Sequence, residues 1–273
     1  MTMRFKAGLL PVLVLAWVAP AGAAMFWQPI PSQHSGMHHD RMAAKHFVLH
    51  NGDGAGVRVL HPDLQEQVLE LKHGQLSFKA TGKNNYHALI ASRDQNHVHE
   101  TAIRYLFLHG KPTGHSPSEL TAASKAVLDI VPSPLPREHW HYQGNQQVRF
   151  QILFQGKPLA GHAVSIHTSH ETDMQATTDA QGMIQVTVPD DFTAIKPGRM
   201  HTPPAEWQFM VQHMQNGEQY RTTLTAPYYV DANHWQLLSW GGLTAAGGML
   251  LGIIMLVRRQ SRKKSSGIKK GRR

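Results

Sequence analysis

The chain has 273 residues, no cysteine, 20 histidines and a formal net charge of +9. The absence of cysteine excludes disulfides, thiolate metal sites and cysteine nucleophiles. The charge does not indicate nucleic-acid binding, because the excess of basic residues lies at the two ends. Nine lie in residues 258–273 and two precede residue 7, which leaves 16 basic and 18 acidic residues in between.

The first predicted element is a secretory signal peptide over residues 1–24. Arg4 and Lys6 precede an apolar run from Leu9 to Val18, and the small residues Ala21-Gly22-Ala23 follow. A positive start, an apolar centre and a small-residue cleavage site are the three parts of such a signal. The apolar run is short for a membrane span, so we expect cleavage, the alternative being an uncleaved N-terminal anchor.

Residues 25–46 form a predicted histidine- and methionine-rich leader with little periodicity before Phe47. Imidazole and thioether groups are borderline and soft ligands for transition metals. In a flexible leader they can converge on a metal ion without a fixed geometry; alternatively, the leader is simply polar and solvated. The candidate ligands in and just after it are His34, Met37, His38, His39, Met42, His46 and His50.

An N-terminal β domain is predicted over residues 47–124. Its short apolar stretches alternate in the manner of strands and are separated by turn-forming residues. Residues 118–126 are compatible with one or two helical turns or with an extended connector. The predicted strands cover residues 57–60, 67–71, 75–80, 84–91 and 103–109.

A second β domain is predicted over residues 125–232. From Val148 to Phe154, apolar and polar residues alternate with the period of a half-buried strand. Gly156-Lys157-Pro158 interrupts this pattern, Ala163–Ile166 is the next strand, and a turn at residues 179–182 precedes a further one. Short strands with a turn about every ten residues are typical of an antiparallel sandwich of immunoglobulin type.

A transmembrane helix is predicted over residues 236–257. The stretch from Leu237 to Val257 carries no charge and is long enough to cross a bilayer. The basic tail, residues 258–273, has no acidic residue and should remain in the cytoplasm by the positive-inside rule. The expected protein is therefore single-pass in the inner membrane, with residues 25–236 in the periplasm. Its fold class is all-β, with two β-sandwich-like parts and this one helix.

Residues 125–189 carry motifs that resemble a known family. The motifs are Leu128-Asp129-Ile130-Val131-Pro132, Gly144, residues 156–161 (GKPLAG) and residues 178–182 (TDAQG). They are similar to the bacterial periplasmic family called domain of unknown function 4198, which includes NikM-like components of nickel and cobalt uptake systems. The resemblance implies two β-rich parts, the second immunoglobulin-like, and a role near transition-metal handling. It supplies no catalytic residue.

Two further histidine pairs have a spacing of one residue: His97 with His99, and His139 with His141. On a strand, residues at this spacing share a face, and two imidazoles on one face can bind one metal ion. The alternative for each pair is a set of exposed histidines without a function.

The residues favour a binding protein over an enzyme. No nucleophile-elbow, zinc-protease or phosphate-loop motif occurs in the sequence. We expect a membrane-anchored periplasmic accessory protein that binds nickel, cobalt or copper and assists a metal transporter or a sensor. The alternative is a β-sandwich interaction module that holds a membrane partner and has no metal site.

Overall fold

A computed structural model describes residues 24–31, 44–136, 141–196, 198, 201–234 and 249. Within these residues the fold is predominantly β, as predicted, with one short helix, α1 (Pro117–Ala122), and one 3-10 turn, η1 (Ala232–His234). The strands are β1 (Phe26–Pro29), β2 (Lys45–His50), β3 (Gly56–Leu60), β4 (Glu66–Leu69), β5 (Gln75–Phe78), β6 (Asn85–Gln95), β7 (Val98–Leu108), β8 (Leu128–Pro132), β9 (Tyr142–Gln143), β10 (Gln147–Phe154), β11 (Lys157–Pro158), β12 (Ala163–Thr168), β13 (Asp173–Thr177), β14 (Met183–Thr187), β15 (Ala205–Gln215) and β16 (Glu218–Tyr229).

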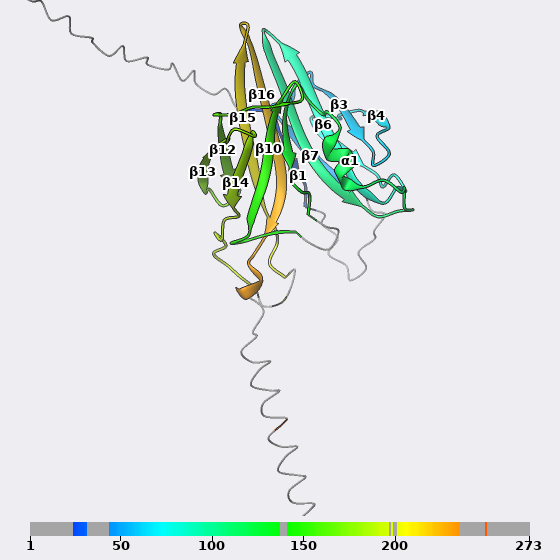
Figure 1. The fold of residues 1–273 in the computed structure, drawn as a ribbon. Coiled ribbons are helices and arrows are strands. Elements are labelled where there is room, and N and C mark those ends of the chain that lie inside the picture. Colours follow the sequence, from blue (N-terminus) through cyan, green and yellow to red (C-terminus); the bar gives the residue numbers. More distant parts are fainter. Residues whose placement is uncertain are drawn as a thin grey trace, which may run out of the picture.

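The largest sheet has nine strands in the order β13-β12-β15-β16-β7-β6-β3-β4, with β9 attached to β16. Its neighbours are antiparallel, except that β16 is parallel to both β7 and β9. Strand β7 lies in the predicted first domain and β16 in the second. The large sheet therefore contains strands from both predicted domains, residues 47–124 and 125–232 (Figure 1). The division into two domains stays a prediction.

Two smaller sheets cover the faces of the large one. Successive residues of β6 point to opposite faces, and Leu89 belongs to one buried cluster while Ile90 belongs to the other. On the Leu89 face the cover is β1-β2-β5, which contributes Trp27 and Phe47. On the Ile90 face it is the sheet built from β8, β10, β11 and β14, which contributes Phe150. The result is a sandwich-like fold with two cores.

The motif loops of the family resemblance are structural. Asp179 closes the turn before β14, because its Oδ1 accepts hydrogen bonds from the backbone N–H groups of Gln181 (2.9 Å) and Met183 (2.8 Å). Gly182 has φ +69°, and a Cβ there would lie 2.6 Å from the carbonyl oxygen of Ile152. Only glycine fits this position without strain. The loop thereby fixes how β14 meets β10.

The first residues of the predicted leader form part of the sandwich. Strand β1 pairs with β2, and Trp27 is buried between them and the large sheet, donating a hydrogen bond from Nε1 to the Ala102 carbonyl (3.1 Å). A four-residue strand with one buried tryptophan is too short to show an alternating pattern, so the sequence did not predict β1. For residues 118–126, where the sequence allowed either helical turns or an extended connector, the structure shows one short helix, α1.

No helix within the described residues is long and apolar enough to span a membrane. The predicted signal peptide, residues 1–24, is outside the described part of the chain up to residue 23. The predicted transmembrane helix, residues 236–257, is outside it except for Met249, and the basic tail is wholly outside it.

Candidate functional site

Residues far apart in the sequence meet in one line across the large sheet. His213 of β15 is paired with Tyr220 of β16, Tyr220 with His99 of β7, and His99 with Asp94 of β6. His162 immediately precedes β12, and its ring centroid lies 4.9 Å from that of His213. Paired residues in a sheet point to the same face. We call these five residues, His162, His213, Tyr220, His99 and Asp94, the imidazole row.

The imidazole row closes one end of the larger core. On β15, Phe209 and Val211 are fully buried on the face that His213 shares two residues further on. Phe154, from the facing sheet, contacts both His213 and Tyr220, with ring centroids 4.4 and 5.0 Å away. The row therefore lies at the rim between core and solvent. The β6–β7 and β15–β16 hairpin tips extend beyond it at the top of Figure 1, and η1 lies at the bottom.

His162 is held in one tautomer by its surroundings. Its Nδ1 lies 2.9 Å from the Ala160 carbonyl oxygen, and a carbonyl can only accept, so Nδ1 carries the proton. Its Nε2 then presents a lone pair to Nδ1 of His213, 2.9 Å away. Thr178 fixes the backbone, because its Oγ1 accepts from the His162 N–H (2.9 Å). A backbone carbonyl that orients an imidazole in this way is typical of metal-binding histidines.

The surroundings of His213 disfavour its protonated form. Burial lowers the pKa of His213, and the neighbouring His162 lowers it further. Two imidazoles in contact disfavour the protonated ring, because each added charge repels the other. The neutral ring is the state in which imidazole binds metal ions.

The other end of the imidazole row is an ion cluster at the hairpin tips. His99 places Nδ1 2.7 Å from Asp94 Oδ1 and Nε2 3.1 Å from Glu218 Oε2, while His97 places Nδ1 2.7 Å from Glu218 Oε1. The hydrogen bond to Asp94 is the main reason that the pKa of His99 is raised. The ring nitrogens of His97 and His99 that are named here are therefore hydrogen-bonded to the carboxylates of Asp94 and Glu218. Among the residues that the structure describes, no group of three or more His, Asp or Glu is arranged to hold a metal ion.

The predicted pair His97 and His99 does not share a strand face. His97 has φ +61° and lies in the turn before β7, so only His99 is part of the strand. The two rings nevertheless meet at one carboxylate, that of Glu218. The prediction missed the turn because Asn96 and His97 both adopt the left-handed conformation, which is uncommon for residues other than glycine.

The other predicted ligands are only partly described. His46 and His50 lie on β2, and His50 stacks on Phe26 (4.6 Å) and contacts Gln28 Oε1 through Nε2 (2.5 Å). These two are therefore strand residues and not part of a flexible leader. His34, Met37, His38, His39, Met42 and His139 lie outside the described residues.

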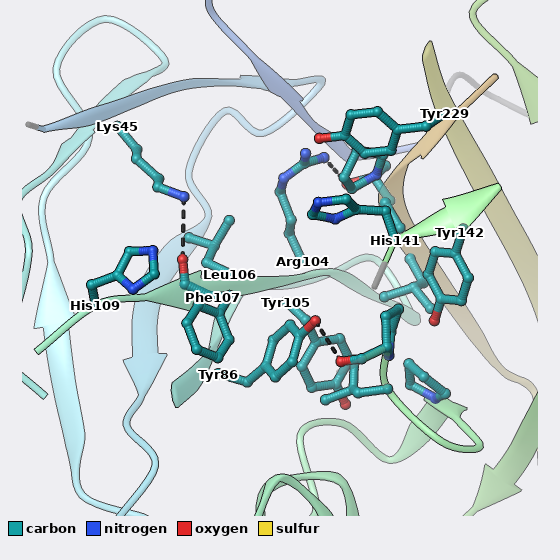
Figure 2. Close-up of a pocket in the computed structure, with 17 residues that line it drawn as sticks. Lys45, Tyr86, Arg104, Tyr105, Leu106, Phe107, His109, His141, Tyr142 and Tyr229 are labelled. Atoms are coloured by element: carbon teal, nitrogen blue, oxygen red, sulfur yellow. Dashed lines mark hydrogen bonds between the residues drawn. The ribbon is translucent and has the colours of Figure 1, made fainter. Parts of the chain in front are cut away.

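His141, from the second predicted pair, lines a cavity of about 300 Å³. Its ring packs against that of Tyr229, with centroids 4.4 Å apart. The same cavity is lined by Lys45, Arg104 and Tyr86, so that cationic groups and aromatic rings face one space (Figure 2). Sequence reasoning missed this site, because its walls come from strands far apart in the chain.

A buried histidine, His87, has a structural role. It is fully buried, with Nδ1 3.1 Å from the Asn85 carbonyl oxygen and Nε2 2.8 Å from Thr81 Oγ1. Because a carbonyl can only accept, Nδ1 carries the proton and donates to Asn85, and Nε2 accepts from the Thr81 hydroxyl, so both nitrogens of the neutral ring are hydrogen-bonded. Burial is the main reason that the pKa of His87 is lowered to about 4.

We expect His87 to make the fold sensitive to acid. Its folded pKa, about 4, is below the value near 6.5 in an unfolded chain, so the unfolded state binds the proton first as the pH falls. The free energy of unfolding should therefore drop by about 3 kcal/mol between pH 7.5 and pH 4 through this residue. Denaturant unfolding of wild type and His87→Gln at both pH values measures it. Equal pH dependence in the two proteins would contradict this assignment.

A scan against models of protein families finds no match, and a comparison with curated proteins finds none either. Among solved structures, Salmonella alpha-2-macroglobulin reacted with methylamine is 12% identical, with a TM-score of 0.26, covering 69% of this chain and 14% of that one. A segment of two fibronectin type-III domains from chicken tenascin is 6% identical, with a TM-score of 0.23, covering 68% and 93%. Both scores are too low to support any inference.

Proposed function

We propose that this protein binds a transition metal ion, nickel, cobalt or copper, as an accessory to metal uptake or sensing at the inner membrane. In this proposal residues 236–257 anchor it, the second part is immunoglobulin-like, and the described strands lie in the periplasm. The observation that carries the proposal is the contact between Nε2 of His162 and Nδ1 of His213 at 2.9 Å.

Two imidazole nitrogens that approach this closely converge on one point in space. The lone pair of His162 Nε2 already points toward His213 and could bind a metal ion placed between the two rings. His213 Nδ1 would offer a second lone pair once the His213 proton had moved from Nδ1 to Nε2. Imidazole is a good ligand for nickel and copper as well as zinc. The remaining coordination positions would be filled by water or by a partner, as suits a protein that passes its metal on.

The place of the imidazole row in the fold agrees with such a role. The row lies at the end of the sandwich that carries the hairpin tips, and η1 lies at the opposite end (Figure 1). The predicted membrane span follows η1 in the sequence. A protein anchored in this way would present the row away from the bilayer, where an incoming metal ion or a partner can reach it.

The second candidate function is an interaction module without a metal site. It is favoured by the self-satisfied cluster of His97, His99, Asp94 and Glu218, in which carboxylates already use the ring nitrogens. Histidines in this cluster would then stabilise the two hairpin tips against each other. Metal titration separates the two candidates.

Calorimetric titration of the full chain, purified in a non-ionic detergent and stripped of metal, should show binding of Ni(II), Co(II) or Cu(II). We expect the double variant His162→Ala, His213→Ala to weaken the site at least tenfold, which is about 1.4 kcal/mol, or to abolish it. The matched control is His167→Ala, an exposed histidine of the neighbouring strand β12 that is bonded to Asp173. It should bind like wild type.

A second variant tests the sequence-predicted leader, with His34, His38, His39, His46 and His50 replaced together by alanine. If only this variant loses binding, the metal function stands but its site is the leader and not the row. If wild type binds none of these metals, the interaction module replaces the proposal.

A further inference from the structure

The cavity lined by His141 exists because two parallel strands separate. The register of β7 with β16 ends at Arg104 and Thr225. Beyond this point β16 stays paired with β15 on one edge, while its other edge has no partner until Tyr228, where β9 joins through Tyr142. The gap between these two pairings is the cavity of about 300 Å³, which is walled by residues from both faces of the sheet.

Among the described residues, one cation in the wall of this cavity, Lys45, has no carboxylate partner. Arg104 is neutralised, because Nη1 and Nη2 bond the two oxygens of Glu206 at 2.6 and 2.9 Å. Lys45 Nζ donates only to the Phe107 carbonyl oxygen, at 3.3 Å, and no carboxylate of the described residues lies within ion-pair distance of it. The described lining contains no aspartate or glutamate.

The surroundings of Lys45 disfavour its charge. Lys45 as a whole residue is exposed, yet partial burial of its ammonium group lowers the pKa, and the positive charge of Arg104 lowers it further. An exposed lysine at the wall of a cavity can bind an anion that enters from solution. An anion in the cavity would relieve both effects.

The rest of the wall is made largely of flat rings. His141 packs against Tyr229, and Tyr86 meets Phe107 edge to face with centroids 5.3 Å apart. Figure 2 shows these rings around the open space, with Lys45 and Arg104 on the same side. Aromatic walls of this kind favour a ligand with a flat apolar ring, and a few polar groups in the wall fix the orientation of that ligand.

We propose that the cavity between β7 and β16 is a binding site for a small monoanion, a carboxylate carried on a flat apolar body, with Lys45 as its anion contact. One negative charge matches Lys45, the one lysine of the described lining, since Arg104 is already paired with Glu206. This site is separate from the imidazole row, and neither proposal depends on the other.

Fluorine NMR titration of the full chain in non-ionic detergent tests the proposal with two matched probes, para-fluorobenzoate and the neutral para-fluorobenzamide. We expect the carboxylate to bind at least tenfold more tightly than the amide. Lys45→Met keeps the length of the stem and removes the charge, so it should weaken the carboxylate at least tenfold and leave the amide unchanged. Protein-free micelles provide the blank.

The control variant is Lys157→Met, an exposed lysine on β11, which should bind both probes like wild type. Equal affinity for carboxylate and amide would overturn the proposal, because the charge of Lys45 would then have no part in binding. Unchanged carboxylate binding in Lys45→Met would overturn it as well. Loss in the imidazole-row variant but not in Lys45→Met would place the anion elsewhere.

Discussion

Replacing Trp207 by alanine should lower the free energy of unfolding by about 3 to 5 kcal/mol. Trp207 has no exposed surface and lies at the centre of an aromatic cluster. Its ring centroid is 4.7 Å from that of Phe209, 5.3 Å from that of Tyr142 and 5.9 Å from those of Phe150 and Tyr228. Alanine would leave a cavity between the two sheets that these rings cannot fill. Denaturant unfolding measures the loss.

The control for this prediction is Trp207→Phe. The indole Nε1 of Trp207 is buried without a hydrogen-bond partner among the described residues, so phenylalanine removes an unpaired polar group and keeps most of the ring contacts. We expect it to cost less than half as much as alanine. If the two variants are equally destabilised, ring packing is not what Trp207 contributes.

The local structure of this protein is largely readable from its sequence. Alternation from Val148 to Phe154 predicts β10, and the turn at residues 179–182 is present with glycine at its left-handed position. The strong patterns at residues 84–91 and 103–109 correspond to β6 and β7. These features depend on neighbours along the chain, which is why a pattern can reveal them. Strands β15 and β16 were not predicted, although Trp207, Phe209 and Val211 alternate.

The way the sheets join is not readable in the same manner. The parallel pairing of β7 with β16 joins residues about 120 positions apart, such as His99 and Tyr220, and no local pattern encodes it. The imidazole row is a consequence of that register. One signal was available: His213 continues the buried face of β15, which predicts an imidazole at the end of the core. Its partner His162 could not be inferred from spacing.

Replacing Lys125 by methionine should lower the free energy of unfolding by about 3 to 5 kcal/mol, because it leaves a buried carboxylate without its cation. The Lys125 side chain is wholly buried, and its Nζ lies 3.2 Å from Asp129 Oδ2 and 2.9 Å from the Thr121 carbonyl oxygen. Burial lowers the pKa of Lys125 and raises that of Asp129. Asp129 is the acidic residue of the Leu-Asp-Ile-Val-Pro motif, so this prediction tests whether the motif is structural.

The double variant Lys125→Met, Asp129→Leu separates a lost ion pair from lost packing. A buried ion pair replaced by apolar residues of similar size is often nearly neutral, so the double variant should recover most of the stability lost in the single one. The single variant should also depend on pH. Without the lysine, the pKa of Asp129 in the folded state lies further above its unfolded value, so the variant loses stability as the pH rises above about 4. Denaturant unfolding at three pH values measures both effects. If the double variant is no more stable than the single one, the ion pair with Asp129 is not what Lys125 contributes. Lys125 would then stabilise the fold through the packing of its methylene groups and its hydrogen bonds to α1.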